Sequence, residues 1–126
     1  MAKALSDDPF QIKWRSGETL NVVIRKTAEH ARDLLEEVWE AIDQGGEYED
    51  TDAMDYLDVL PLGVVWEMGE PFAVVLSTGG PHIEITGGGR SLRYTLTVDW
   101  GGEKATVHGD AIDRTGAYFR DMYEDM

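Results

Sequence analysis

Residues 92–100, Leu-Arg-Tyr-Thr-Leu-Thr-Val-Asp-Trp, alternate between large apolar and polar side chains. Successive side chains of a β-strand point to opposite faces, so this stretch predicts a strand with one face in a core and the other in water. Strand-like runs also occupy residues 64–68, 72–78, 82–86 and 104–108. The links between these runs are short and rich in glycine, which favours antiparallel pairing of neighbours. The sequence therefore predicts a β-meander of four to five strands.

Two other segments place apolar residues at the three- and four-residue spacing of an amphipathic helix. The first covers residues 28–44 and is terminated by Gly45 and Gly46. The second covers residues 111–124, with Asp110 as its N-cap. We expect both helices to cover one face of the meander, so that the fold is a two-layer α+β domain.

Two shorter stretches are less regular. Thr51 is in position to cap a short helix that Pro61 would end. Residues 10–25 fit two patterns: an alternation of apolar and polar residues that predicts a β-hairpin, and a helical spacing that predicts one long helix from near Glu18. The sequence does not decide between them.

A length of 126 residues suits one domain, which we place at residues 9–126 after a disordered tail at residues 1–8. There is no cysteine, which excludes a disulfide framework and thiolate metal sites. No apolar run is long enough to span a membrane, and the first residues lack the pattern of a signal peptide. These features predict a cytoplasmic protein.

The charge is concentrated in one part of the chain. Acidic residues outnumber basic ones by 25 to 11, for a formal net charge of −14. Residues 33–89 contain fourteen acids and no Lys or Arg, and ten of those acids lie in residues 36–58. Because this charge repels nucleic acid and anionic lipid, we expect neither direct nucleic-acid binding nor membrane binding.

The acidic segment is the predicted partner-binding site, and the expected partner is a basic protein surface. Two tyrosines within the segment would supply aromatic anchors, while the carboxylates would meet Lys and Arg. The predicted partner-binding residues are Glu36, Glu37, Glu40, Asp43, Glu47, Tyr48, Glu49, Asp50, Asp52, Asp55, Tyr56 and Asp58. Asp43 lies in the last turn of its helix, where the helix dipole disfavours an acid by ~0.3–1 kcal/mol, so its presence there hints at selection for charge.

Metal binding is the alternative that the histidines raise. His82 and Glu84 share one face of a strand, and Asp99 or His108 from a neighbouring strand could join them in a divalent-metal site. The wet face of any sheet gives the same pattern, and we favour that interpretation. Residues 49–55 lack the glycine and the closing glutamate of a calcium loop. No cofactor is predicted.

No other motif points to catalysis. The glycine-rich stretches at residues 79–81 and 87–90 do not open a helix, so hairpin turns are favoured over phosphate cradles. Ser77 and Thr78 lack the glycine-flanked elbow of a serine hydrolase. The chain is therefore expected not to be an enzyme.

One motif resembles a known signature. The run Leu-Ser-Thr-Gly-Gly-Pro-His at residues 76–82, followed by Asp-Trp-Gly at residues 99–101, resembles a signature of short acidic proteins from bacteria, their phages and plasmids, a largely uncharacterised family. The resemblance covers residues 63–102 and implies a strand–turn–strand framework without a catalytic residue. In composition alone, the chain is also similar to anti-restriction and anti-CRISPR proteins that imitate DNA.

Three functions follow as hypotheses. The leading one is a non-enzymatic inhibitor or decoy that binds the nucleic-acid-binding surface of a defence or regulatory protein, since carboxylates on a helix can approximate phosphates spaced about 1.7 Å along a duplex. The second is an interaction module of a mobile element that binds through the sheet face around Arg93, Thr95 and Thr97. The third is a small metal-dependent enzyme. The sequence leaves the identity of the partner and the oligomeric state open.

Overall fold

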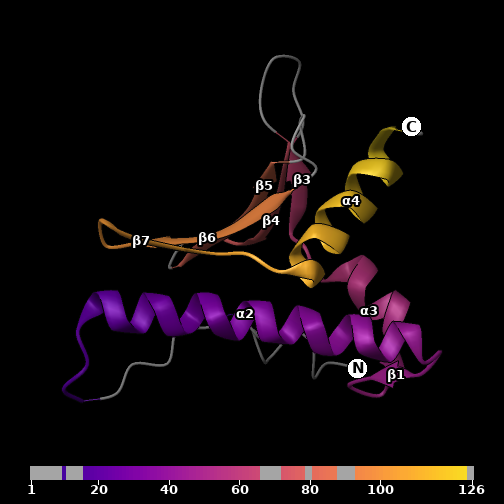
Figure 1. Ribbon diagram of the computed structural model, residues 1–126, viewed down its shortest axis with the longest axis horizontal. Coiled ribbons are helices and arrows are strands. Elements are labelled where there is room, and N and C mark those ends of the chain that lie inside the picture. Colours follow the sequence, from indigo (N-terminus) through magenta and orange to yellow (C-terminus); the bar gives the residue numbers. More distant parts are fainter. Residues whose placement is uncertain (1–9, 11–15, 66–71, 79–80, 88–92, 125–126) are drawn as a thin grey trace.

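A five-stranded antiparallel sheet forms one layer of the protein, and helices form the other (Figure 1). The computed structural model describes residues 10, 16–65, 72–78, 81–87 and 93–124. The predicted tail at residues 1–8 lies outside these residues. The predicted α+β class, with a meander covered by two helices, is confirmed.

The sheet has the strand order β3-β4-β5-β6-β7, so each strand pairs with its neighbours in sequence. The strands are β3 (Gly63–Val65), β4 (Ala73–Ser77), β5 (His82–Gly87), β6 (Tyr94–Trp100) and β7 (Glu103–Val107). All five predicted strands are present, although residues 66–68 of the first and residue 92 of the fourth lie outside the described residues. The meander follows from the short links, which leave antiparallel pairing as the accessible arrangement.

The register separates a buried face from an open one. Val74, Ile85 and Leu96 lie opposite one another on β4, β5 and β6, and all three are fully buried. The residues between them, such as Thr86 and Thr95, point to the other face and are partly exposed. The strict alternation of β6 therefore determines which face the helices cover.

The helix α2 (Leu20–Asp43) is the longest element and lies along the buried face of the sheet (Figure 1). The predicted helix over residues 28–44 is confirmed, and it extends eight residues further toward the N-terminus. The hairpin interpretation of residues 10–25 is wrong, because Val23, Ile24 and the residues that follow are buried at helical spacing against the sheet. Tertiary packing overrides the β-propensity of this run. Residues 11–15 lie outside the described part.

The segment after α2 contains structure that the sequence did not predict. A small hairpin pairs β1 (Glu47–Tyr48) with β2 (Thr51–Asp52). The helix α3 (Ala53–Val59) follows, and its N-cap is Asp52, whose side chain accepts a hydrogen bond from the backbone N–H of Asp55 at 3.2 Å. The predicted cap at Thr51 is wrong by one residue, because the carboxylate that accepts from the first turn of α3 is that of Asp52.

The last helix, α4 (Asp110–Glu124), packs against β4, β5 and β6 and against α2. Asp110 was predicted as the N-cap; the helix instead begins one residue earlier, and the N–H of Asp113 bonds to the carbonyl of Gly109. The indole N–H of Trp39 donates to the buried hydroxyl of Thr115 at 2.9 Å, which fixes α4 against α2. In the described part of the chain, no helix has the length and apolarity that crossing a membrane requires.

Gly116 provides a test of this packing. A Cβ at this position of α4 would overlap the buried ring of Tyr94 on β6. We expect Gly116→Ala to destabilise the protein by about 1–3 kcal/mol, even though alanine favours a helix by ~1 kcal/mol. The measurement is urea unfolding followed by circular dichroism. Gly63→Ala is the control, since a Cβ there meets no atom within 4 Å; equal stability of both variants would contradict this packing.

Candidate functional site

The acidic residues of the segment 36–58 are all exposed and are carried by three elements that pack together: α2, the β1–β2 hairpin and α3. We refer to these ten residues as the acidic surface. They are Glu36, Glu37, Glu40, Asp43, Glu47, Glu49, Asp50, Asp52, Asp55 and Asp58. The apolar side of α2 is buried against the sheet. The acids of α2 therefore lie on the side of the helix that faces solvent.

Tyr48 and Tyr56, the two predicted aromatic anchors, are half-buried. Their rings meet edge to face with centroids 4.8 Å apart, and both pack against the core. Burial, together with the nearby carboxylate of Glu37, raises the pKa of Tyr48 to about 12. These rings fix the hairpin to α2 and α3 and leave only part of their surface for a partner.

Several members of the acidic surface have partners within the protein. The guanidinium of Arg114 on α4 donates two hydrogen bonds to the carboxylate of Asp43, each 2.9 Å long. This bonding lowers the pKa of Asp43. Asp52 caps α3, and Asp58 accepts a hydrogen bond from the hydroxyl of Tyr118. The position of Asp43 in the last turn of α2 therefore gives no hint of selection for charge, because Arg114 supplies a positive charge that offsets the helix dipole there.

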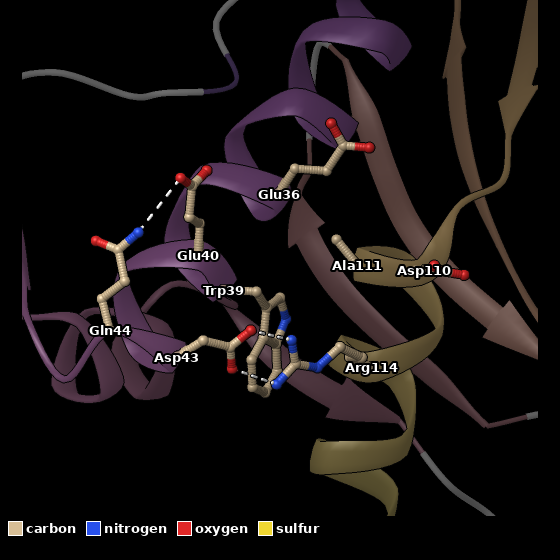
Figure 2. Close-up of a pocket in the computed structure, with 8 residues that line it drawn as sticks. All are labelled: Glu36, Trp39, Glu40, Asp43, Gln44, Asp110, Ala111 and Arg114. Atoms are coloured by element: carbon tan, nitrogen blue, oxygen red, sulfur yellow. Dashed lines mark hydrogen bonds and ion pairs between the residues drawn. The ribbon is translucent and has the colours of Figure 1, made fainter.

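An open groove of about 270 Å³ lies between the C-terminal half of α2 and the start of α4 (Figure 2). Trp39 and Arg114 line it, and the guanidinium carbon of Arg114 is 4.1 Å from the centre of a Trp39 ring. The carboxylates of Glu36, Glu40 and Asp110 also line it, from both helices. The groove is thus an acidic depression with an aromatic side chain that already stacks on an arginine.

Sequence reasoning missed two residues of this groove. Arg114 is 71 positions from Asp43, and no local pattern indicates that the two side chains meet. Asp110 was assigned a capping role only, yet it lines the groove opposite α2. Both belong to the acidic side of the molecule because α4 packs beside α2, which is a property of the tertiary fold.

The β1–β2 hairpin places acids where they reduce stability. Glu47 lies directly opposite Asp52, a like-charge pair across two strands. Glu49 and Asp50 form the turn with φ angles of 52° and 62°, a left-handed conformation in which asparagine and glycine are favoured. The turn therefore keeps two carboxylates at a cost in backbone energy.

The other candidate chemistries receive less support from the geometry. The ring of His82 meets Glu84 at 2.5 Å, and Asp99 lies opposite His82, whereas His108 bonds to Thr95. Within the described residues, no group of three or more His, Asp or Glu side chains is placed to hold a metal ion. The glycines at 79–80 and 88–89 lie outside those residues, but the strands on either side of each link pair antiparallel.

The chain matches no family model, and no curated protein or solved structure matches it. The resemblance of residues 63–102 to a family of short acidic proteins therefore stays a prediction.

Tyr118, whose hydroxyl bonds to Asp58 of the acidic surface, makes the stability of the protein depend on pH. Burial and the hydrogen bond to Asp58 raise its pKa to about 12, whereas the unfolded chain has the ordinary value of about 10. The neutral phenol stabilises the fold fully below pH 10, and this stabilisation is lost as the pH rises from 10 to 12. We expect Tyr118→Phe to lower the unfolding free energy by about 1 kcal/mol at pH 8, with the difference shrinking above pH 10. Urea unfolding at several pH values measures this; a difference that stays constant to pH 12 would contradict the assignment.

The left-handed backbone of the hairpin turn leads to a second prediction. Replacing Glu49→Asn together with Asp50→Gly supplies the residues that suit both left-handed positions, so we expect a gain of about 1 kcal/mol in unfolding free energy. The control is Glu49→Gln with Asp50→Gln, which removes the same charges but keeps the unfavourable backbone. Thermal unfolding of both variants tests the idea, and the idea fails if the control gains as much stability.

Proposed function

We propose that the protein is a non-enzymatic acidic binder whose acidic surface docks on a basic, nucleic-acid-binding surface of another protein, in the manner of a DNA mimic. The observation that carries this proposal is the gathering of ten exposed carboxylates on α2, the β1–β2 hairpin and α3. Within the described residues, Arg114 pairs with one of these acids, Asp43.

The folding stability that these acids remove supports a role in binding. Glu47 faces Asp52, and the turn of the hairpin holds two carboxylates in left-handed backbone. Neutral residues at Glu47, Glu49 and Asp50 would give a more stable fold, whereas Asp52 also caps α3. Residues that lower stability are retained at sites where function requires them, so the cost favours binding over a purely structural role.

The groove between α2 and α4 indicates which side chain a partner would contribute. Arg114 stacks on Trp39 and pairs with Asp43, an arrangement that holds a guanidinium by cation–π and bidentate contacts. Glu36, Glu40 and Asp110 line the same groove. Arginine side chains that normally contact DNA phosphates carry the same charge and the same planar donors.

The expected binding mechanism is electrostatic. A protein that binds DNA presents Lys and Arg to a dense row of phosphates, and exposed carboxylates meet the same cations. Association should be fast at low salt and should weaken steeply as salt screens the charges. In this function, the protein acts in the cytoplasm as an inhibitor or decoy and transfers no chemical group.

A retention experiment tests the proposal. Tagged protein is incubated with a bacterial lysate at 50 mM and 500 mM NaCl, and retained proteins are identified by mass spectrometry. We expect one nucleic-acid-binding protein to be retained at low salt, released at high salt and displaced by duplex DNA. Retention that does not change with salt or DNA would contradict mimicry.

A charge variant tests whether the surface or the net charge is responsible. Glu36→Gln, Glu40→Gln and Glu47→Gln together change the charge of −14 by three units. We expect this triple variant to bind the retained partner about tenfold more weakly, since each lost contact is worth ~0.5 kcal/mol. Titration calorimetry measures the effect.

The matched control removes three exposed acids that lie elsewhere: Glu29→Gln, Glu103→Gln and Asp121→Asn. Its net charge equals that of the triple variant. We expect it to bind like the wild type, and equal weakening in both variants would mean that the net charge alone drives binding.

A further inference from the structure

The groove between α2 and α4 already holds one guanidinium, that of Arg114 (Figure 2). Its carbon lies 4.1 Å from the centre of a Trp39 ring, and its two terminal nitrogens donate hydrogen bonds of 2.9 Å to the two carboxylate oxygens of Asp43. Stacking on an aromatic ring and bidentate bonding to one carboxylate are the contacts that favour arginine over lysine. We refer to the Trp39 ring and the Asp43 carboxylate as the cradle. The cradle has the geometry of an arginine site, filled by a side chain of the same molecule.

The contact between Arg114 and the cradle is open to solvent. The side chains of Arg114 and Asp43 are 44% and 57% exposed. An ion pair at such exposure is weak, because water and salt screen it. Trp39 itself is only 8% exposed, and the guanidinium of Arg114 lies over its ring. An arginine from outside would therefore reach the cradle by taking the place of Arg114.

Arg114 has a second carboxylate within reach. Asp110 is four residues earlier on α4 and lines the same groove. Residues at this spacing are neighbours on a helix surface, and an acid that precedes a base by four residues is the favourable order. Arg114 can thus turn from Asp43 to Asp110 by changing its rotamer, while the bond from Trp39 to Thr115 keeps α4 in place. The exchange leaves the guanidinium with a carboxylate partner.

The charge and the size of the groove indicate one cationic side chain as its occupant. Arg114 and four carboxylates line it, namely those of Glu36, Glu40, Asp43 and Asp110. An incoming cation reduces the excess of negative charge, whereas an anion or a second copy of this acidic chain is repelled. The volume of about 270 Å³ is below the roughly 300–1,000 Å³ of small-molecule pockets, which suits a single side chain.

We propose that the cradle is an arginine-selective subsite, which Arg114 fills in the free protein and an arginine of the basic partner takes over on binding, while Arg114 turns to Asp110. This inference rests on the proposed function, because it names the residue type that the basic partner inserts. Lysine is a poorer occupant, since its ammonium is a point charge that lacks the planar fork of two donors.

Two small probes test the selectivity: N-acetyl-arginine amide and N-acetyl-lysine amide, which carry the same single charge. Each is titrated into the ¹⁵N-labelled full chain at 50 mM NaCl, and the NMR shift of the Trp39 indole N–H is followed. Arg114→Lys opens the cradle at an unchanged net charge of −14, because an ammonium cannot replace both bonds to Asp43. We expect the arginine probe to bind this variant at least fivefold more tightly than the wild type, and the lysine probe to gain less than twofold. An equal gain for both probes, or no gain for the arginine probe, would overturn the proposal.

Arg114→Gln removes the internal cation altogether and should strengthen binding of the arginine probe at least tenfold. Because this variant also makes the net charge more negative by one unit, Arg25→Gln is the matched control. Arg25 is exposed on α2, eleven residues or roughly 16 Å before the groove residue Glu36. We expect the control to bind within twofold of the wild type. A gain as large as that of Arg114→Gln would mean that net charge alone attracts the probe, and would overturn the proposal.

Asp43→Asn in the Arg114→Gln background removes the bidentate acceptor and should cancel the gain for arginine; a gain that persists would overturn the proposal. Circular dichroism checks that each variant is folded, and Arg114→Lys with its two probes carries the test if Arg114→Gln does not fold. The proposed function fails separately, if the lysate yields no salt-sensitive nucleic-acid-binding protein. The arginine subsite fails if the opened cradle does not prefer arginine, even when such a partner is retained.

Discussion

The packing of α2 on the sheet is the contact on which the rest of the structure depends. The helix buries an apolar stripe that runs from Val23 to Trp39 against residues of β6 and β7. This stripe occupies only one side of the helix, so the outer positions make no contribution to the core. They can carry any polar residue, and the chain uses them for carboxylates. The core and the acidic surface are thus two sides of one helix.

The same helix organises the elements around it. Trp39 bonds to Thr115 and stacks with Arg114, which places α4 beside the acidic half of α2. On the other side, the rings of Tyr48 and Tyr56 hold the hairpin and α3 against α2. Aromatic side chains therefore provide the apolar contacts that keep a strongly repelling set of acids in place. The acids repel one another, and the packing of these rings offsets the stability that the repulsion removes.

The sequence predicted the parts of the fold that depend on local periodicity. The alternation in residues 92–100 identified β6 and its buried face, and the spacing from Ala28 to Ile42 identified most of α2. Residues 20–25 satisfied both a strand and a helix pattern, and only contact with the sheet decides for the helix. The β1–β2 hairpin was missed because its turn, Glu49-Asp50, lacks the asparagine or glycine that marks such turns. The acidic segment could be singled out from the sequence, but the partners of Asp43 and Asp58 come from α4 and depend on the tertiary fold.

The central claim is that the acidic surface carries more negative charge than the fold needs, and that binding explains the excess. The most direct measurement is the unfolding free energy of the variant with Gln at positions 36, 40 and 47, at 20 mM NaCl. Our account predicts a variant about 1 kcal/mol more stable than the wild type, with the gain vanishing at 500 mM NaCl, since each relieved repulsion is worth ~0.3–0.5 kcal/mol. A variant less stable than the wild type at low salt would show that these acids serve the fold itself, and would contradict the account.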